Sequence, residues 1–324
     1  MDLVAIIVII LVTTLLSRGA SQTARVENTL VILKVIAILV FIFVGATAIK
    51  SANYTPFIPK YHVNADGSAF GGWQGIYAGV SEIFLAYIGF DSIAANSAEA
   101  KNPQKTMPRG ILGSLVIAVI LFISVALVLV GMFKYSDYAN NAEPVGWALR
   151  QSGHALVATV VQAIAVVGMF TALIGMMLVG SRLIYSFGRD GLLPKWLGKL
   201  DNNLPNAIVL TIIAIALGAF FPFTFLAQLI SAGTLIAFMF VSLGVYALRP
   251  REGKDIPMPS FKMPLYPVLP ALGFLGALGI FWGLDIQAKT YALGWFILGM
   301  IIYFAYGMNH STATLDKMAE HEKD

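Results

Sequence analysis

Stretches of roughly 20 apolar residues, the length that spans a bilayer as a helix, recur along almost the whole chain. This pattern constrains the fold more than any other feature, because a helix advances by about 1.5 Å per residue. Only 12% of the 324 residues are charged, whereas soluble domains have about 25%. The sequence therefore predicts an all-α polytopic membrane protein. Nine candidate transmembrane helices can be delimited, at about 3–16, 27–49, 74–98, 109–133, 155–181, 206–221, 224–248, 266–285 and 290–308.

The distribution of lysine and arginine predicts the orientation of these helices. If the segments after the first, third, fifth, seventh and ninth helices are cytoplasmic, they hold fifteen of the 21 basic residues and the opposite side holds five. The remaining one, Lys34, lies inside the second helix. Basic residues favour cytoplasmic segments. We therefore expect the chain to begin outside and to end in the cytoplasm.

Several kinds of site are disfavoured by composition. The chain has no cysteine, which excludes disulfides and thiolate metal sites, and its four histidines fall in loops, at a segment end or in the tail. No nucleophile–base arrangement or phosphate-binding loop is present, so we expect neither an enzyme nor a bound metal or cofactor. The basic residues lie between apolar stretches, which does not indicate binding of nucleic acid.

The third stretch, 74–98, carries two acids inside its apolar region, Glu82 and Asp91. Gly89 precedes Asp91 by two residues, and a glycine beside a charge at membrane depth predicts a helix broken near residues 86–91. Freed backbone groups are tolerated there only when they line a polar cavity. The segment is interpreted as half of a binding site for a small solute. The alternative is an ordinary span with a packing glycine and a buried acid satisfied by a neighbour.

Lys34, two turns inside the second stretch, has two interpretations. Its ammonium could snorkel to the membrane surface. It could instead face the protein interior, where desolvation disfavours the charged form, and couple proton movement to solute movement or replace a sodium ion as a fixed charge. Asp91 is the better candidate for a gate or proton-linked group, and Glu82 is expected nearer the external vestibule. Ser231 and Thr234 in the seventh stretch offer hydroxyls, although such hydroxyls often bond to their own helix.

Small residues also predict faces for close helix packing. Gly168, Thr171, Gly175 and Gly180 form one such face in the fifth stretch. Gly279 and Gly283 in the eighth stretch have the same four-residue spacing, with a contact between two copies of the chain as one alternative.

Four segments together resemble the amino acid–polyamine–organocation permeases, and the cationic amino acid transporter branch in particular. They are ARVENTLVILK, FLAYIGFDSIAANSAEAKNPQKTMPRGI, SRLIYSFGRDGLLP and SAGTLIAFMFVSLGVYALRP. The resemblance covers nearly the whole chain. It implies a fold of twelve spans in which the first ten form two inverted five-helix repeats.

The nine stretches resemble spans four to twelve of that fold, so the first three spans would be missing from this chain. The resemblance then implies a single transport domain, 1–324. Residues 1–49 would be the remnant of the first repeat and residues 74–248 the second five-helix repeat. Residues 266–308 would be two additional spans, and residues 309–324 a cytoplasmic tail.

The resemblance also implies roles for individual residues. The substrate amine would meet carbonyls around Ala86, Tyr87 and Ile88, and Leu85 stands where the family often has a phenylalanine lid. Lys34 matches the lysine of the family's fifth span, where sodium-coupled relatives hold a cation. The full set of residues expected to bind the substrate is Leu85, Ala86, Tyr87, Ile88, Gly89, Phe90, Ser231 and Thr234.

The function expected from this resemblance is a proton-coupled amino acid symporter of the inner (plasma) membrane that works by alternating access. Few acids lie near the predicted break, which favours a neutral, branched-chain substrate over a cationic one. One alternative is a non-transporting fragment or a membrane-embedded partner subunit, in which case this chain alone transports nothing. Within transporters, an amino acid exchanger and a polyamine or organocation carrier are further alternatives. The oligomeric state is not indicated.

Overall fold

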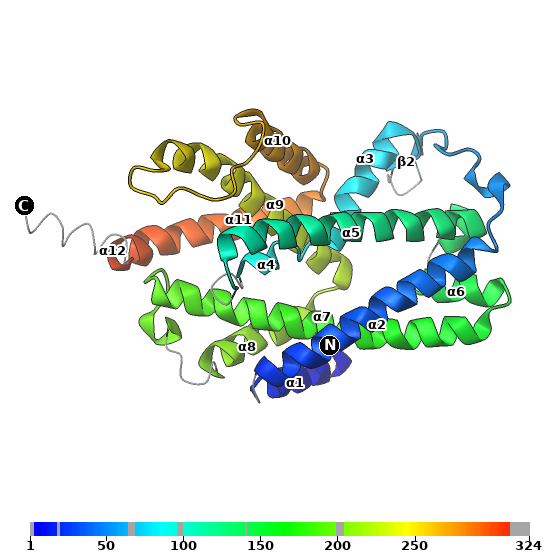
Figure 1. Ribbon diagram of the computed structural model, residues 1–324, viewed down its shortest axis with the longest axis horizontal. Helices are drawn as coiled ribbons and strands as arrows, with labels where there is room; N and C mark the ends of the chain where they lie inside the picture. The colour runs from blue at the N-terminus through cyan, green and yellow to red at the C-terminus, as the bar shows by residue number, and fades with distance from the viewer. Residues whose placement is uncertain are drawn as a thin grey trace, which may run out of the picture. The chain divides into compact units, whose positions relative to one another are not determined.

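The computed structural model describes residues 3–17, 20–63, 69–95, 100–139, 141–198 and 204–311, and most of these residues are helical (Figure 1). The α-helices are α1 (Leu3–Ser17), α2 (Ala20–Ala46), α3 (Gly72–Ile83), α4 (Ser92–Ala95), α5 (Pro103–Met132), α6 (Pro144–Gln151), α7 (Ala155–Arg189), α8 (Leu204–Phe220), α9 (Phe223–Leu248), α10 (Val268–Trp282), α11 (Ile286–Ile302) and α12 (Met308–His310). Two short strands, β1 (His62–Val63) and β2 (Ala69–Phe70), form an antiparallel hairpin in which His62 pairs with Phe70.

Helices coincide with all nine apolar stretches, but they differ in length. Among the described residues, six helical segments are long and apolar enough to cross a bilayer: Asn28–Ala46, Gly72–Ala94, Pro103–Met132, Ala155–Arg189, Phe223–Arg251 and Ile286–His310. The other three apolar helices, Leu3–Thr14, Ile208–Phe220 and Val268–Trp282, are shorter than the length of about 20 residues that spans hydrocarbon without thinning or kinking. Length and composition therefore support a polytopic helical protein, while the count of nine crossings stays a prediction.

Two local elements were not predicted. The polar segment 134–154 lies between two predicted transmembrane helices, and it contains α6, which starts at Pro144 and buries Ala148 and Leu149. A helix of eight residues is too short to show up as an apolar stretch of membrane length. The continuation of α11 through Tyr303–Gly307 is a π-helix, which no feature of the sequence indicated. The predicted tail, 309–324, lies outside the described residues from 312 onward.

Contacts divide the chain into two compact units. The first unit comprises residues 1–10, 73–111 and 177–324, and the second comprises residues 11–72 and 112–176. The helices α5 and α7 each contribute residues to both units. The first unit therefore contains the whole predicted break and α9, and the second contains Lys34.

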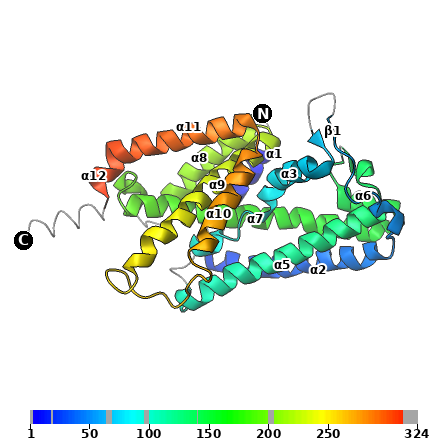
Figure 2. The same ribbon diagram turned by 90° about the horizontal axis from the view of Figure 1, so that it is seen from above.

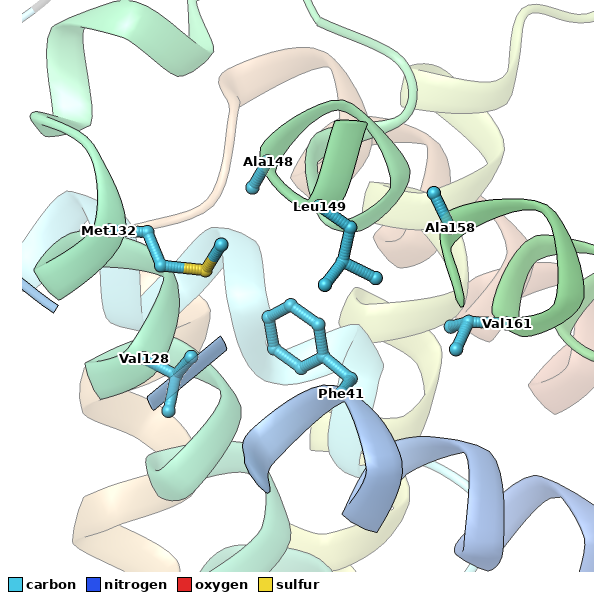
Figure 3. Close-up of a cluster of buried hydrophobic side chains, with 7 residues drawn as sticks. All are labelled: Phe41, Val128, Met132, Ala148, Leu149, Ala158 and Val161. Carbon is cyan, nitrogen blue, oxygen red and sulfur yellow. The ribbon is translucent and has the colours of Figure 1, made fainter. Parts of the chain in front are cut away.

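The second unit is built around Phe41 of α2, whose side chain is 1% exposed (Figure 3). Its ring lies against Val128 and Met132 of α5 and Leu149 of α6, and α7 completes the cluster with Ala158 and Val161. Gly45 permits this packing, because a Cβ there would lie 2.5 Å from a methyl group of Val128. The end of α2 therefore lies against the end of α5, and the two helices are neighbours in Figure 2.

Polar contacts hold α6 against the start of α7. Arg150 donates to Glu143 and to Gln162, each at 2.6 Å, and the Gln162 amide also donates to Glu143 at 2.5 Å. Two hydrogen bonds hold the pKa of the Glu143 carboxyl below its usual range. The one from Arg150 has the larger effect and the one from Gln162 the smaller. Nearby, burial and then the charge of Asp137 raise the pKa of Tyr138 to about 12, and its hydroxyl donates to the Leu129 carbonyl at 2.7 Å. These contacts hold the segment between α5 and α7 against both helices.

In the first unit, α3, α9 and α10 pack together. The cluster centres on Leu235 of α9 and Phe281 of α10, with Phe84 against it. Of the two glycines predicted to form a packing face, Gly283 packs closely against α3 of the same chain, whereas a Cβ at Gly279 would meet no atom within 4 Å. Tyr77 donates to the Gly279 carbonyl, Ser81 donates to the Ile280 carbonyl at 3.2 Å, and a Cβ at Gly283 would overlap the Ser81 hydroxyl.

A pair of phenylalanines on α2 tests the core of the second unit. Phe41 is 1% exposed and Phe43 is 72% exposed. Phe41→Ala should leave a cavity and cost about 3 kcal/mol or more, whereas Phe43→Ala should cost well under about 1 kcal/mol in detergent. Thermal unfolding of the purified variants measures the difference. Equal losses of stability in the two variants would contradict the packing of α2 around Phe41.

Candidate functional site

The helix that begins at Gly72 is interrupted where the sequence predicts a break. The α3 helix ends at Ile83, a 3-10 turn follows at Phe84–Tyr87, and Ile88 leaves the helical region with φ −66° and ψ 133°. Gly89 has φ 126°, a conformation that side chains strongly disfavour, and α4 starts at Ser92. Residues 88–91 therefore form a turn between two helical segments within one candidate span.

Asp91 stabilises this turn with both its side-chain carboxylate and its backbone carbonyl. The Gly89 amide donates to the Asp91 carboxylate at 3.2 Å, so it does not continue the helix toward the carbonyls of Leu85 or Ala86. The Asp91 carbonyl then accepts from the Ala94 amide at 2.9 Å, which starts the next helical turn. The acid thus supplies the partner that a freed amide needs away from water. Asp91 is half-buried, as are Leu85, Tyr87, Ile88, Gly89 and Phe90, while Ala86 is exposed.

The break packs on α9 through aromatic rings. Phe84 meets Phe238 edge to face with ring centroids 6.3 Å apart, and Phe90 meets the same ring at 5.7 Å. Sequence reasoning missed Phe238, because nothing in the spacing of phenylalanines along the chain identifies this partner. The predicted residues Ser231 and Thr234 also lie on α9. Ser231 is 1% exposed and its hydroxyl donates to the Ala227 carbonyl of its own helix at 2.9 Å, whereas Thr234 is half-buried.

Glu82 differs from Asp91 in its surroundings. Its side chain is exposed on α3, and it makes no hydrogen bond or ion pair with the described part of the chain. The first unit therefore holds Asp91 by a local backbone contact and leaves Glu82 at its surface.

Lys34 of α2 reaches the neighbouring helix α7 within the second unit. Its ammonium donates to the Thr171 hydroxyl at 2.8 Å and to the Gly168 carbonyl at 3.4 Å. Thr171 is 3% exposed, and its hydroxyl in turn donates to the Gly168 carbonyl at 2.8 Å. The ammonium is therefore held by protein groups, as the second interpretation of Lys34 requires.

Gly168 makes this contact sterically possible. A Cβ at Gly168 would lie 2.9 Å from Cγ of Lys34 and still closer to its Cδ. The small-residue face predicted on this helix is thus where the lysine stem lies. Sequence reasoning did not assign Gly168 and Thr171 to Lys34, although a small residue followed three positions later by a hydroxyl is the pattern that could receive an intramembrane ammonium.

An apolar groove of about 270 Å³ lies between α2 and α7. It is lined by Ile36, Ala37 and Val40 of α2 and by aliphatic side chains of α7 between Leu156 and Ile164. No polar group lines it, so it is unsuited to the charged ends of an amino acid. In the described residues, no group of three or more histidine or acidic side chains could hold a metal ion.

The sequence profile of the family described as amino acid permease matches residues 2–306. The chain belongs to the amino acid permease family. This confirms the superfamily to which the sequence motifs pointed, and it is a family of membrane transporters rather than of enzymes. Together with its apolar helices, membership makes the permease a multi-pass membrane protein.

The permease is similar to several curated relatives. It is 64% identical over 309 residues to the branched-chain amino acid permease BcaP of Lactococcus lactis subsp. cremoris (strain MG1363), covering 94% of this chain and 66% of that protein. It is 33% identical over 314 residues to the branched-chain amino acid permease BcaP of Bacillus subtilis (strain 168), covering 96% of this chain and 65% of that protein.

A third relative, the chloroplastic cationic amino acid transporter 9 of Arabidopsis thaliana, is 34% identical over 259 residues, which are 79% of this chain and 43% of that protein. The chain therefore spans just under two thirds of the length of the two bacterial relatives. These identities do not confirm the predicted assignment to the cationic branch.

Two glycines in the third span test the break directly. Gly89→Ala should cost about 1–3 kcal/mol, because φ 126° is strained for any residue with a Cβ. Gly79→Ala is the matched control, because Gly79 lies inside α3 and a methyl group added there would meet no atom within 4 Å. It should be neutral or slightly stabilising. Thermal unfolding of both variants in detergent gives the comparison, and an unaffected Gly89→Ala protein would count against the turn.

Proposed function

We propose that the permease is a proton-coupled symporter for neutral, branched-chain amino acids that works by alternating access in the plasma membrane. The observation that carries this proposal is the interrupted helix at Phe84–Asp91, because an interruption at membrane depth offers backbone groups to a solute. Both bacterial relatives are named branched-chain amino acid permeases, which supports the substrate class.

In the proposed site, the substrate ammonium donates to the carbonyls of Ala86, Tyr87 and Ile88, which follow the last regular turn of the helix. The aliphatic substrate side chain lies against Leu85 and Phe90. Apolar lining of this kind fits a branched-chain residue, since burial of each methylene contributes about 0.8 kcal/mol. Thr234 of α9, which is half-buried, completes the proposed lining, whereas the Ser231 hydroxyl stays bonded to the Ala227 carbonyl of its own helix.

The surroundings of the two acids, Asp91 and Glu82, favour a substrate with a neutral side chain over one with a cationic side chain. The Asp91 carboxylate already accepts the Gly89 amide, and Glu82 is exposed on α3. A cationic substrate would need an acid that is free to pair with it inside the site. The identity of 64% to a branched-chain permease, against 34% to the cationic transporter, supports the same choice.

Lys34 is the proposed proton-coupling residue. Its ammonium rests on a hydroxyl and a carbonyl, and no acidic side chain in the described residues forms an ion pair with it. A charge held only by dipoles in a low-dielectric setting is sensitive to any change in those dipoles. A shift of α7 relative to α2 would alter the distance to Thr171 and so favour release or uptake of the proton. Asp91 is proposed as a gate, and Glu82 as a group of the external vestibule.

For the fold, we propose that all nine apolar helices cross the membrane in the arrangement of the five-plus-five inverted repeat, with the C-terminus in the cytoplasm. The tight connection between α8 and α9, at Phe221 and Pro222, supports a hairpin of two spans. The excess of basic residues on one side supports the orientation.

Uptake of labelled leucine by cells expressing the complete open reading frame that contains this sequence tests the function. Leucine should accumulate above its external concentration, and a protonophore should abolish the accumulation. Lys34→Met should reduce uptake to simple equilibration, because methionine replaces the aliphatic stem of lysine but has no amine to carry a proton. Lys50→Met, in an exposed position after α2, should leave accumulation unchanged.

Other outcomes identify the alternatives. Uptake that requires internal amino acid and ignores the protonophore would indicate an exchanger. Accumulation of arginine or spermidine without leucine would indicate a cationic or polyamine carrier. Undiminished accumulation in Lys34→Met would remove the lysine from the coupling mechanism, provided that the variant unfolds at the same temperature as the parent protein.

A further inference from the structure

Two basic segments of the first unit meet at a hydrogen bond. One is the start of α5, and the other is the loop 249–267 between α9 and α10. The Ser260 hydroxyl donates to the Gln104 carbonyl at 3.0 Å, across 156 residues of chain. Figure 2 shows this loop reaching the first turn of α5. Charges on the two segments therefore belong to one surface.

Ion pairs inside the loop neutralise its arginines but not its lysines. Arg249 pairs with Glu252 at 3.7 Å, and Arg251 pairs with Asp255 at 2.6 Å. These are the only acids between residues 249 and 267, and residues 100–111 contain none. Five exposed cations thus have no ion-pair partner in the part of the chain that the structure describes. We call them the basic surface: Lys101, Lys105, Arg109, Lys254 and Lys262.

Large apolar side chains are exposed among these cations. Met258 is 59% exposed, Phe261 is 47% exposed and Leu265 is 74% exposed. Their loop is anchored rather than free. Tyr246 of α9 donates to the Pro267 carbonyl at 2.5 Å, and the Arg249 guanidinium lies 5.3 Å from the centre of the Tyr266 ring. The loop is therefore anchored at both ends to the end of α9, and its three large apolar side chains are exposed.

This alternation of lysine with exposed apolar residues is typical of segments that lie in the headgroup region of a bilayer. Here it occurs at the ends of helices that are apolar enough to span the membrane, α5 and α9. Clusters of basic residues next to a span are attracted by anionic lipids. A soluble phosphate would engage the cations but would leave Met258, Phe261 and Leu265 facing water.

We propose that the basic surface is a binding site for anionic phospholipid headgroups, with Met258, Phe261 and Leu265 inserted beside the acyl chains. The lysines contribute attraction without a fixed geometry, whereas the planar guanidinium of Arg109 can donate two parallel hydrogen bonds to a phosphate. The Ser260–Gln104 hydrogen bond keeps the two halves of the surface together. Permease in an anionic bilayer then collects such lipids at this face.

Fluorescence resonance energy transfer from a dye on the protein to a labelled lipid measures this binding. The chain has no cysteine, so a single donor dye can be placed at Gln104→Cys, where only the backbone carbonyl takes part in the Ser260 contact. The protein is reconstituted in nanodiscs of phosphatidylcholine that contain a trace of acceptor-labelled phosphatidylglycerol. Transfer should exceed that to acceptor-labelled phosphatidylcholine, and salt should reduce the excess.

Variants that change the lysines of the basic surface distinguish bound lipid from lipid that lies near the dye by chance. Lys105→Gln with Lys262→Gln should lower the preference for phosphatidylglycerol about fivefold per lysine. Lys105→Arg with Lys262→Arg should keep it, and Lys60→Gln, in an exposed loop of the second unit, should leave it unchanged. Equal transfer to the two lipids, or equal loss in the Lys60 control, would overturn the proposal. Competition by inorganic phosphate at equal concentration would also overturn it, because it would assign the site to a soluble anion.

Discussion

A helix that crosses a bilayer can be interrupted only where the freed backbone groups find partners, because hydrocarbon offers none. In this chain, Asp91 supplies that partner. The Asp91 carboxylate accepts a hydrogen bond from the Gly89 amide, and the Asp91 backbone carbonyl accepts one from the Ala94 amide in the following helical turn. This arrangement lets the chain leave the helix after Tyr87 and resume it at Ser92. The proposed solute site depends on it, since an uninterrupted helix would keep its carbonyls for itself.

The charged side chain of Lys34 also needs polar partners inside the membrane. An ammonium at membrane depth costs several kcal/mol unless polar groups surround it. The second unit supplies them through Thr171 and Gly168, and the missing side chain of Gly168 leaves room for the lysine stem. No carboxylate forms an ion pair with this ammonium among the described residues. The coupling role proposed for Lys34 rests on this arrangement, in which a hydroxyl and a carbonyl are the partners of the ammonium.

Much of the helical architecture could be predicted from the sequence, because long apolar stretches mark where membrane helices lie, although helices such as α7 continue past the apolar stretch to Arg189. The stretch 155–181 became α7 and the stretch 224–248 became α9, each starting within one residue of the prediction. The break could be predicted because its determinants, Gly89 and Asp91, are two residues apart. Local chemistry of this kind is visible in a sequence.

Contacts between distant segments could not be predicted. The partners of Lys34 lie 134 and 137 residues away, and Phe238 meets two rings of the break from another helix. The short helix α6 was missed because its stability comes from burial of Ala148 and Leu149, not from a long apolar run. Ser231 illustrates the limit for site residues. Its sequence context offered a hydroxyl to a substrate, and the fold gives that hydroxyl a backbone partner in its own helix.

Amide hydrogen exchange across the third span, measured residue by residue in nanodiscs, tests the central claim most directly. The amides of residues 76–83 lie in α3 and should exchange slowly, whereas those of residues 88–91 should exchange much faster and should become protected when leucine is added. Uniformly slow exchange from residue 76 to residue 94, with no effect of leucine, would mean that the helix is continuous and that the permease binds its substrate elsewhere.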